Sequence, residues 1–134
     1  MLESVMLIDD NKHDNFFHET AINDTGLAKS VVKYQSAEKA LGYLSEAMVN
    51  QAGVPPLILL DINMPGMSGW EFLQEYQKLP HQPQHQTIII MLTTSNNPND
   101  RERAKQEPAL RGFLNKALTE EMFDEIVKTH FVKE

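Results

Sequence analysis

The sequence predicts an open α/β sheet of parallel strands, with helices packed against both of its faces. Short apolar segments alternate along the chain with segments whose apolar residues follow helical spacing. This alternation is typical of right-handed strand–helix–strand crossovers. Several of the short segments, such as 57–60, are continuously apolar, which indicates strands buried on both faces.

Five strands are expected, and most of them end beside polar residues. Asp9 and Asp10 follow the first segment, Asp61 follows the third, and Asn115 and Lys116 follow the fifth. The same arrangement, a polar residue directly after an apolar strand, occurs at several strands. The expected strands cover residues 5–8, 30–34, 57–60, 87–92 and 113–114.

Five helices are expected between and after the strands. Ser36 can cap the second helix and Thr119 the last, because a hydroxyl before a helix accepts a hydrogen bond from its first turn. Asn99 can cap the fourth helix, which should end before Pro108. The expected helices cover residues 13–23, 36–48, 69–78, 99–107 and 119–130.

Three further features are interpreted locally. Phe16 and Phe17 belong to the apolar pattern of the first expected helix. The segments 49–56 and 79–86 are rich in proline or polar residues and are expected to be solvated connections. The histidine pair of the second connection, His81 and His85, is interpreted as part of a polar loop rather than as a metal site.

The composition indicates one soluble domain. The 134 residues include 12 Lys and Arg, 19 Asp and Glu and no Cys, which gives a net charge of −7. The length favours a single domain over residues 1–134, and the lack of Cys excludes disulfides, thiolate metal sites and a Cys nucleophile. An acidic chain repels nucleic-acid backbones and anionic membranes. We therefore expect a cytoplasmic protein that binds neither directly.

The polar residues at the strand ends are expected to form one site. The carboxyl ends of parallel strands share one edge of the sheet, and open α/β folds bind ligands there. Asp9, Asp10 and Asp61 would bring three carboxylates to this edge, together with the hydroxyl of Thr93 and the ammonium of Lys116. Each residue alone is explained as a turn, cap or surface residue. Their joint occurrence favours a site.

Carboxylates gathered this closely need a cation. Two like charges ~4 Å apart repel by about 4 kcal/mol at an effective dielectric of about 20. An all-oxygen site suits Mg²⁺, and with Lys116 and Thr93 it would clamp a phosphoryl group. Asp61 ends the most hydrophobic strand and is the best candidate for a nucleophile that forms an acyl phosphate. We expect its carboxylate to face open solvent.

These motifs resemble those of receiver domains in two-component response regulators, of the chemotaxis-regulator type. The matching segments occur in the family's order and span nearly the whole chain. They are Leu7-Ile8-Asp9-Asp10-Asn11, Leu59-Leu60-Asp61-Ile62-Asn63-Met64-Pro65-Gly66-Met67-Ser68-Gly69, Met91-Leu92-Thr93 and Phe113-Leu114-Asn115-Lys116. The resemblance implies a flavodoxin-like, doubly wound sheet in strand order 2-1-3-4-5.

The resemblance also implies a role for each acidic residue. Asp61 is similar to the aspartate that accepts a phosphoryl group from a histidine kinase or phosphotransfer protein. Asp10 and Asp61 resemble direct Mg²⁺ ligands, and Asp9 resembles a ligand that acts mainly through water. Asn63 resembles a ligand through its backbone carbonyl.

The remaining matched residues would respond to phosphorylation. Lys116 would pair with the phosphoryl group, and Thr93 would donate a hydrogen bond to it. Thr93 and the aromatic Phe113 would then move and change the face formed by the fourth helix, fifth strand and fifth helix. Gly66 and Gly69 resemble loop glycines that allow backbone turns near the site.

Two positions depart from the family pattern. Ala117 stands where a proline preceded by a cis peptide bond is usual. Because a non-proline cis bond costs ~2.5–4 kcal/mol, we predict a trans bond between Lys116 and Ala117. Thr94 is larger than the residue usual after the switch threonine, so it should narrow access to the phosphoryl group.

The leading hypothesis is a phosphorylation-dependent signalling switch rather than an enzyme. It would act as a stand-alone receiver through an unknown downstream protein or a phosphoryl relay, and could form a homodimer on phosphorylation. A Mg²⁺-dependent phosphohydrolase is the enzymatic alternative, although Asn63 occupies the position where such enzymes carry a second carboxylate. A degenerate binding module that is never phosphorylated is the third possibility.

Overall fold

The computed structural model describes residues 1–81 and 86–131, so His85 lies outside the described residues. Five strands alternate with five helices in this part of the chain, as the sequence predicts. The strands are β1 (Val5–Ile8), β2 (Val31–Tyr34), β3 (Leu57–Leu60), β4 (Ile88–Thr93) and β5 (Leu110–Asn115). The helices are α1 (Lys12–Thr25), α2 (Ala37–Asn50), α3 (Gly69–Tyr76), α4 (Pro98–Lys105) and α5 (Glu120–His130).

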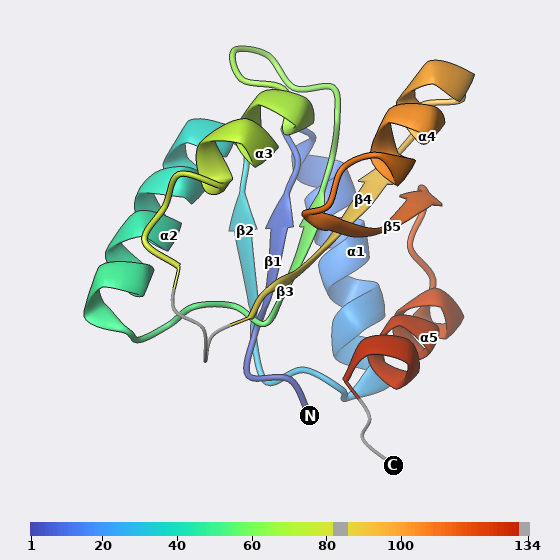
Figure 1. Ribbon diagram of the computed structural model, residues 1–134. Helices are drawn as coiled ribbons and strands as arrows, with labels where there is room; N and C mark the ends of the chain where they lie inside the picture. The colour runs from blue at the N-terminus through green and yellow to red at the C-terminus, as the bar shows by residue number, and fades with distance from the viewer. Residues whose placement is uncertain (82–85, 132–134) are drawn as a thin grey trace.

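The strands form one parallel sheet in the order β2-β1-β3-β4-β5, which confirms the predicted flavodoxin-like topology. Helices cover both faces of the sheet (Figure 1). Side chains of α2, α3 and α4 pack in one core cluster, and side chains of α1 and α5 pack in the other. Because successive strand residues point to opposite faces, β1 and β3 supply both clusters and are buried at every position.

The helix caps agree with the sequence in two cases and differ in a third. Ser36 and Thr119 cap α2 and α5 as predicted. The cap of α4 is Asn97 rather than Asn99, since the Asn97 side chain accepts a hydrogen bond from the Asn99 N–H. Pro98 then occupies the first turn, where its missing N–H costs nothing.

The buried face of α1 differs from the prediction. Phe16 and Phe17 are 66% and 55% exposed, and the helix instead buries Asn15, His18 and Ile22. These three residues follow the helical period and lie on one stripe. Asn15 is buried because its side-chain amide donates a 2.9 Å hydrogen bond to the backbone carbonyl of Asp9. The exposed phenylalanines therefore form a surface feature.

Among the described residues, no helix is both long and apolar enough to cross a membrane.

Candidate functional site

The predicted acidic residues meet at the carboxyl edge of the sheet. Asp9 and Asp10 follow β1, and Asp61 follows β3, the neighbouring strand. Carboxylate oxygens of these residues lie within 4.8 Å of one another. Asp9 and Asp61 are buried, whereas Asp10 is exposed. The group therefore has an inner pair of carboxylates and an outer one that reaches solvent.

The Asp61 carboxylate is fixed on one side by the backbone. Its Oδ1 accepts a 2.9 Å hydrogen bond from the Ile62 N–H, and its Oδ2 lies 3.4 Å from the Lys116 ammonium. The prediction that this carboxylate faces open solvent is wrong, because the side chain is only 7% exposed. The physical reason is the neighbouring Lys116 side chain, itself 9% exposed, whose ammonium lies beside the carboxylate.

Lys116 lies among several carboxylates. Its nitrogen is 2.5 Å from Asp9 Oδ2 and 2.8 Å from Asp14 Oδ2, in addition to its contact with Asp61. Burial alone lowers the pKa of this ammonium, but the hydrogen bonds to Asp14 and Asp9 outweigh burial, so the pKa lies above its usual value. Lys116 is therefore held in its charged form.

The surroundings of Asp9 disfavour its charged form, whereas those of Lys116 favour the charged form. Burial raises the pKa of its carboxyl above the usual value, and the nearby charge of Asp61 adds to this effect. The contact with Lys116 and a 2.9 Å hydrogen bond from the Asn11 N–H oppose it. A second cation at this edge would relieve the remaining repulsion between the carboxylates.

Thr93 ends β4 at the same edge and is fully buried. Its hydroxyl oxygen accepts a 3.2 Å hydrogen bond from the Ser95 N–H. Its backbone carbonyl accepts a 2.9 Å hydrogen bond from the Lys116 N–H. Thr93 and Lys116 are thus joined directly through the backbone. The neighbouring Thr94 is exposed, and its predicted effect on access stays a prediction.

The loop after Asp61 depends on a glycine. A Cβ atom at Gly69 would lie 2.4 Å from the Asp61 carbonyl oxygen and 3.0 Å from the Ile62 Cα. The Gly69 N–H donates a 2.8 Å hydrogen bond to the Ile62 carbonyl. This close approach brings the start of α3 against the candidate acceptor residue. Asn63 lies in the same loop and is exposed.

The peptide bond after Lys116 corrects another prediction. The bond between Lys116 and Ala117 is cis, so the predicted trans bond is wrong. The prediction considered only the intrinsic cost of the bond. In the folded chain the residues on both sides of Ala117 are fixed. The Lys116 ammonium contacts buried carboxylates, and Leu118 is fully buried in the core cluster that contains side chains of α1 and α5.

The donor set fits a hard divalent cation. Carboxylate oxygens are the ligands that Mg²⁺ prefers, and this ion keeps part of its water shell. The exposed Asp10 gives the group an open side toward water. The buried Asp9 and Asp61 leave excess negative charge for a cation to balance. The residues present therefore suit Mg²⁺.

Sequence reasoning did not identify Asp14. This residue lies in the first turn of α1, where acidic side chains are common because they interact favourably with the helix dipole. Its contact with Lys116 joins residues 102 positions apart. Its sequence position, four residues after Asp10 on the same edge, was the available signal.

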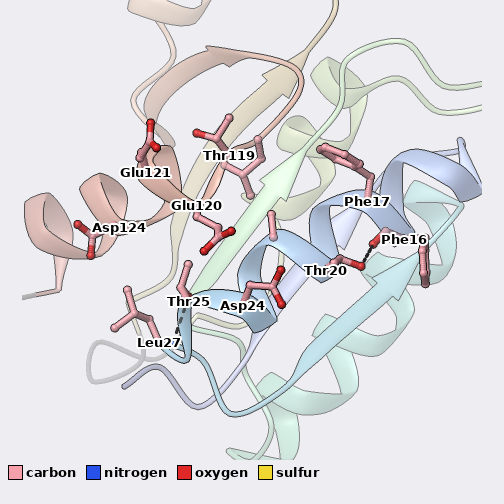
Figure 2. Close-up of a pocket in the computed structure, with 12 residues that line it drawn as sticks. Phe16, Phe17, Thr20, Asp24, Thr25, Leu27, Thr119, Glu120, Glu121 and Asp124 are labelled. Atoms are coloured by element: carbon pink, nitrogen blue, oxygen red, sulfur yellow. Dashed lines mark hydrogen bonds between the residues drawn. The ribbon is translucent and has the colours of Figure 1, made fainter.

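A groove separates α1 from the beginning of α5 (Figure 2). Its volume is about 860 Å³. The exposed Phe16 and Phe17 line it from α1, and Leu118 and Thr119, which follow Lys116 closely in the chain, line it from the other side. The acidic residues that line it are Asp24, Glu120, Glu121 and Asp124.

Comparisons with known proteins agree with this geometry. The sequence pattern of the response regulator receiver domain matches residues 5–128. The polar-differentiation response regulator DivK of Brucella ovis is 27% identical over 133 residues, which is 97% of each chain. The response regulator Rcp1 of Synechocystis is 26% identical over 97 residues, and this match spans 72% of the present chain but only 65% of Rcp1.

A solved structure gives the same result in three dimensions. The two-component response regulator from Cytophaga hutchinsonii superimposes with a TM-score of 0.86 at 29% identity, covering 96% of both chains. The sheet order, the acidic edge and the matched segment all lead to one assignment. The chain belongs to the family of response regulator receiver domains, which act in two-component signalling.

Proposed function

We propose that residues 1–134 form a single receiver domain in which Asp61 accepts a phosphoryl group and thereby switches the protein's signalling state. One observation carries this proposal. The carboxylate oxygens of Asp9, Asp10 and Asp61 lie within 4.8 Å of one another, and the Lys116 ammonium lies 3.4 Å from Asp61 Oδ2. This combination suits transfer of a group that carries several negative charges.

The two carboxylate oxygens of Asp61 have different partners. Oδ1 is engaged by the Ile62 N–H, whereas Oδ2 points to Lys116 and is the better nucleophile for an incoming group. The donor is a phosphohistidine of a histidine kinase or phosphotransfer protein. Asp61 Oδ2 attacks the phosphorus, the P–O bond forms, the P–N bond breaks, and its electron pair returns to the histidine ring.

Mg²⁺ would be held by the side chains of Asp10 and Asp61 and by the backbone carbonyl of Asn63, and Asp9 would act mainly through water. When bound, it neutralises the carboxylates and the charge on the transferred phosphoryl oxygens. Lys116 binds a phosphoryl oxygen, and the Thr93 hydroxyl donates a hydrogen bond to another. The Thr93 hydroxyl accepts a hydrogen bond from the Ser95 N–H before transfer, and its own proton can still be donated to the phosphoryl group. We expect Thr93 to turn toward that group.

The change reaches the α4–β5–α5 face through contacts of Arg101. Its guanidinium lies 5.0 Å above the Phe113 ring and donates a 3.0 Å hydrogen bond to Asn115. Asn115 donates in turn to the carbonyls of Thr93 and Ser95, at 3.5 and 3.2 Å. Movement of Thr93 is therefore coupled to α4 and β5. A downstream protein that binds this face would sense phosphorylation, and a homodimer could form there.

The α1–α5 groove offers a docking surface for the donor. It begins close to Lys116 and combines two exposed phenylalanines with four carboxylates. This surface is complementary to a helix that carries apolar residues flanked by Lys or Arg. A donor helix bound there would bring its phosphohistidine to the edge that holds Asp61.

The proposal is tested by incubation with Mg²⁺ and acetyl phosphate. A switch should take up about one phosphoryl group per chain, and uptake should require Mg²⁺. Sustained turnover of p-nitrophenyl phosphate would instead support the phosphohydrolase. Failure to bind Mg²⁺ by calorimetry would contradict the proposal and favour a binding module that is not phosphorylated.

A further inference from the structure

We propose that Asp14 is a positioning residue for Lys116: it holds the ammonium on the α1 side of the site and must release it when a phosphoryl group arrives on Asp61. This inference rests on the proposed function. It concerns a carboxylate outside both the acceptor residue and the set that suits the metal.

The distances show where Lys116 rests. Its nitrogen is 2.5 Å from Asp9 Oδ2, 2.8 Å from Asp14 Oδ2 and 3.4 Å from Asp61 Oδ2. Asp14 thus makes a shorter contact with Lys116 than Asp61 does, although Lys116 must bind the phosphoryl group on Asp61. The contact between Lys116 and Asp9 would weaken once a divalent cation neutralises Asp9, whereas Asp14 would keep its full charge.

Asp14 is fixed well enough to act in this way. Its backbone N–H donates a 3.1 Å hydrogen bond to the side chain of Asn11, the cap of α1. One residue further on, Asn15 ties the helix to the carbonyl of Asp9. The first turn of α1 is therefore attached to the same strand end that supplies Asp9. These bonds fix the backbone from which the Asp14 side chain reaches Lys116.

Asp14 is also suited to release its partner. Its side chain is 36% exposed, against 7% for Asp61, so water can solvate its carboxylate when Lys116 leaves. A buried carboxylate would lose its counter-ion at much greater cost. The phosphorylated state must break the Asp14–Lys116 pair, and this requirement lowers the stability of that state.

The proposal predicts tighter binding of a phosphoryl mimic once Asp14 is neutralised. At saturating Mg²⁺, Asp14→Asn should bind beryllofluoride about three- to fivefold more tightly than the wild type, the size expected from a partly exposed ion pair. Asp14→Glu, which keeps the charge, should return the affinity toward the wild-type value. Glu46→Gln removes one negative charge from an exposed position on α2, outside both the site and the α1–α5 groove, and is the control.

A double-mutant cycle separates positioning from general charge. Removing any nearby carboxylate favours an anion, and that effect survives without the lysine. In a Lys116→Met background, Asp14→Asn should therefore have a smaller effect on beryllofluoride affinity than in the wild type. Equal effects in both backgrounds would overturn the inference, as would no change in the affinity of Asp14→Asn.

The resting contact can be observed without any phosphoryl mimic. The NMR signals of the Lys116 side chain should shift in Asp14→Asn and stay in place in Glu46→Gln. Unchanged Lys116 signals would contradict the positioning role even if the proposed function is correct. If the Lys116 signals shift in Asp14→Asn but the wild type does not bind beryllofluoride with Mg²⁺, the contact exists. Phosphoryl acceptance, and with it the release that we propose, is then contradicted.

Discussion

The ammonium nitrogen of Lys116 lies 3.4 Å from Asp61 Oδ2, although 55 positions separate the two residues. Both side chains are at least nine-tenths buried. The ammonium thus balances the negative charge of two buried carboxylates, those of Asp61 and Asp9. Its removal should destabilise the metal-free protein more than it destabilises the metal-bound protein.

Lys116→Met should lower the free energy of unfolding by about 3 kcal/mol without divalent cations, because buried carboxylates lose their partner. Mg²⁺ should restore much of this loss. Lys29→Met, which breaks the exposed pair with Glu3, should cost less than about 1 kcal/mol. Urea unfolding with and without Mg²⁺ measures the free energy of unfolding of both variants. Equal losses of stability in Lys116→Met and Lys29→Met would argue against a buried charge cluster.

The approach of α3 to Asp61, the candidate acceptor residue, predicts a steric effect at Gly69. A Cβ there would meet the Asp61 carbonyl at 2.4 Å, and backbone atoms cannot move aside cheaply. Gly69→Ala should destabilise the protein by ~2 kcal/mol or more. A Cβ at Gly42, in α2, meets nothing within 4 Å, so Gly42→Ala should stabilise the helix by ~0.5–1 kcal/mol. Denaturant unfolding of the pair tests the contrast, and similar shifts in both would refute it.

The groove predicts different results for large and small phosphodonors. Replacing Phe16 and Phe17 together by Ala should slow phosphoryl transfer from the histidine kinases that use the groove, because docking loses its apolar contacts. Acetyl phosphate needs no docking surface, so its rate should not change. Transfer time courses with a panel of autophosphorylated kinases measure the effect.

Val49→Ala is the control for the groove prediction. Val49 is 66% exposed but belongs to α2, on the opposite face of the sheet. This variant should transfer at the wild-type rate with every donor. Loss of acetyl phosphate reactivity in the double phenylalanine variant would instead indicate damage to the site itself.

His18 predicts a loss of stability in acid. Burial, aided by the positive charge of Lys116, lowers the pKa of His18 from its ordinary value of 6.5. Below that pH the unfolded chain binds a proton that the folded chain does not, so stability falls as the pH falls. His18→Gln should show a shallower decline below about pH 6.5 than the wild type.

The exposed His13 on the same helix gives the matched comparison for this pH effect. His13→Gln should keep the wild-type pH dependence of unfolding. Thermal midpoints recorded in the absence of divalent cations between neutral and mildly acidic pH provide the measurement. Identical profiles for His18→Gln and the wild type would rule out a contribution from His18.

The sheet was predictable because its strands carry a strong local signal. The segments at 57–60 and 88–92 are continuously apolar, which is the pattern expected for strands buried on both faces. β5 was predicted too short, at 113–114 rather than 110–115. Arg111 and Gly112 interrupt its apolar pattern, and the strand forms there because β4 supplies hydrogen-bond partners.

The buried face of α1 could not be predicted from hydrophobicity. Asn15 and His18 are polar, and Asn15 is accommodated through a hydrogen bond to Asp9 that only the folded chain contains. The candidate site was predictable where residues follow strand ends, as Asp61 does. Asp14 follows no strand, and its importance depends on a contact with Lys116 across 102 positions.

The central claim concerns the carboxylate of Asp61, and intact-mass spectrometry after exposure to Mg²⁺ and acetyl phosphate tests it most directly. We expect a mass increase of one phosphoryl group in the wild type and in Glu46→Gln, and no increase in Asp61→Asn. Full phosphorylation of Asp61→Asn, or an unreactive wild type with every phosphodonor, would contradict it.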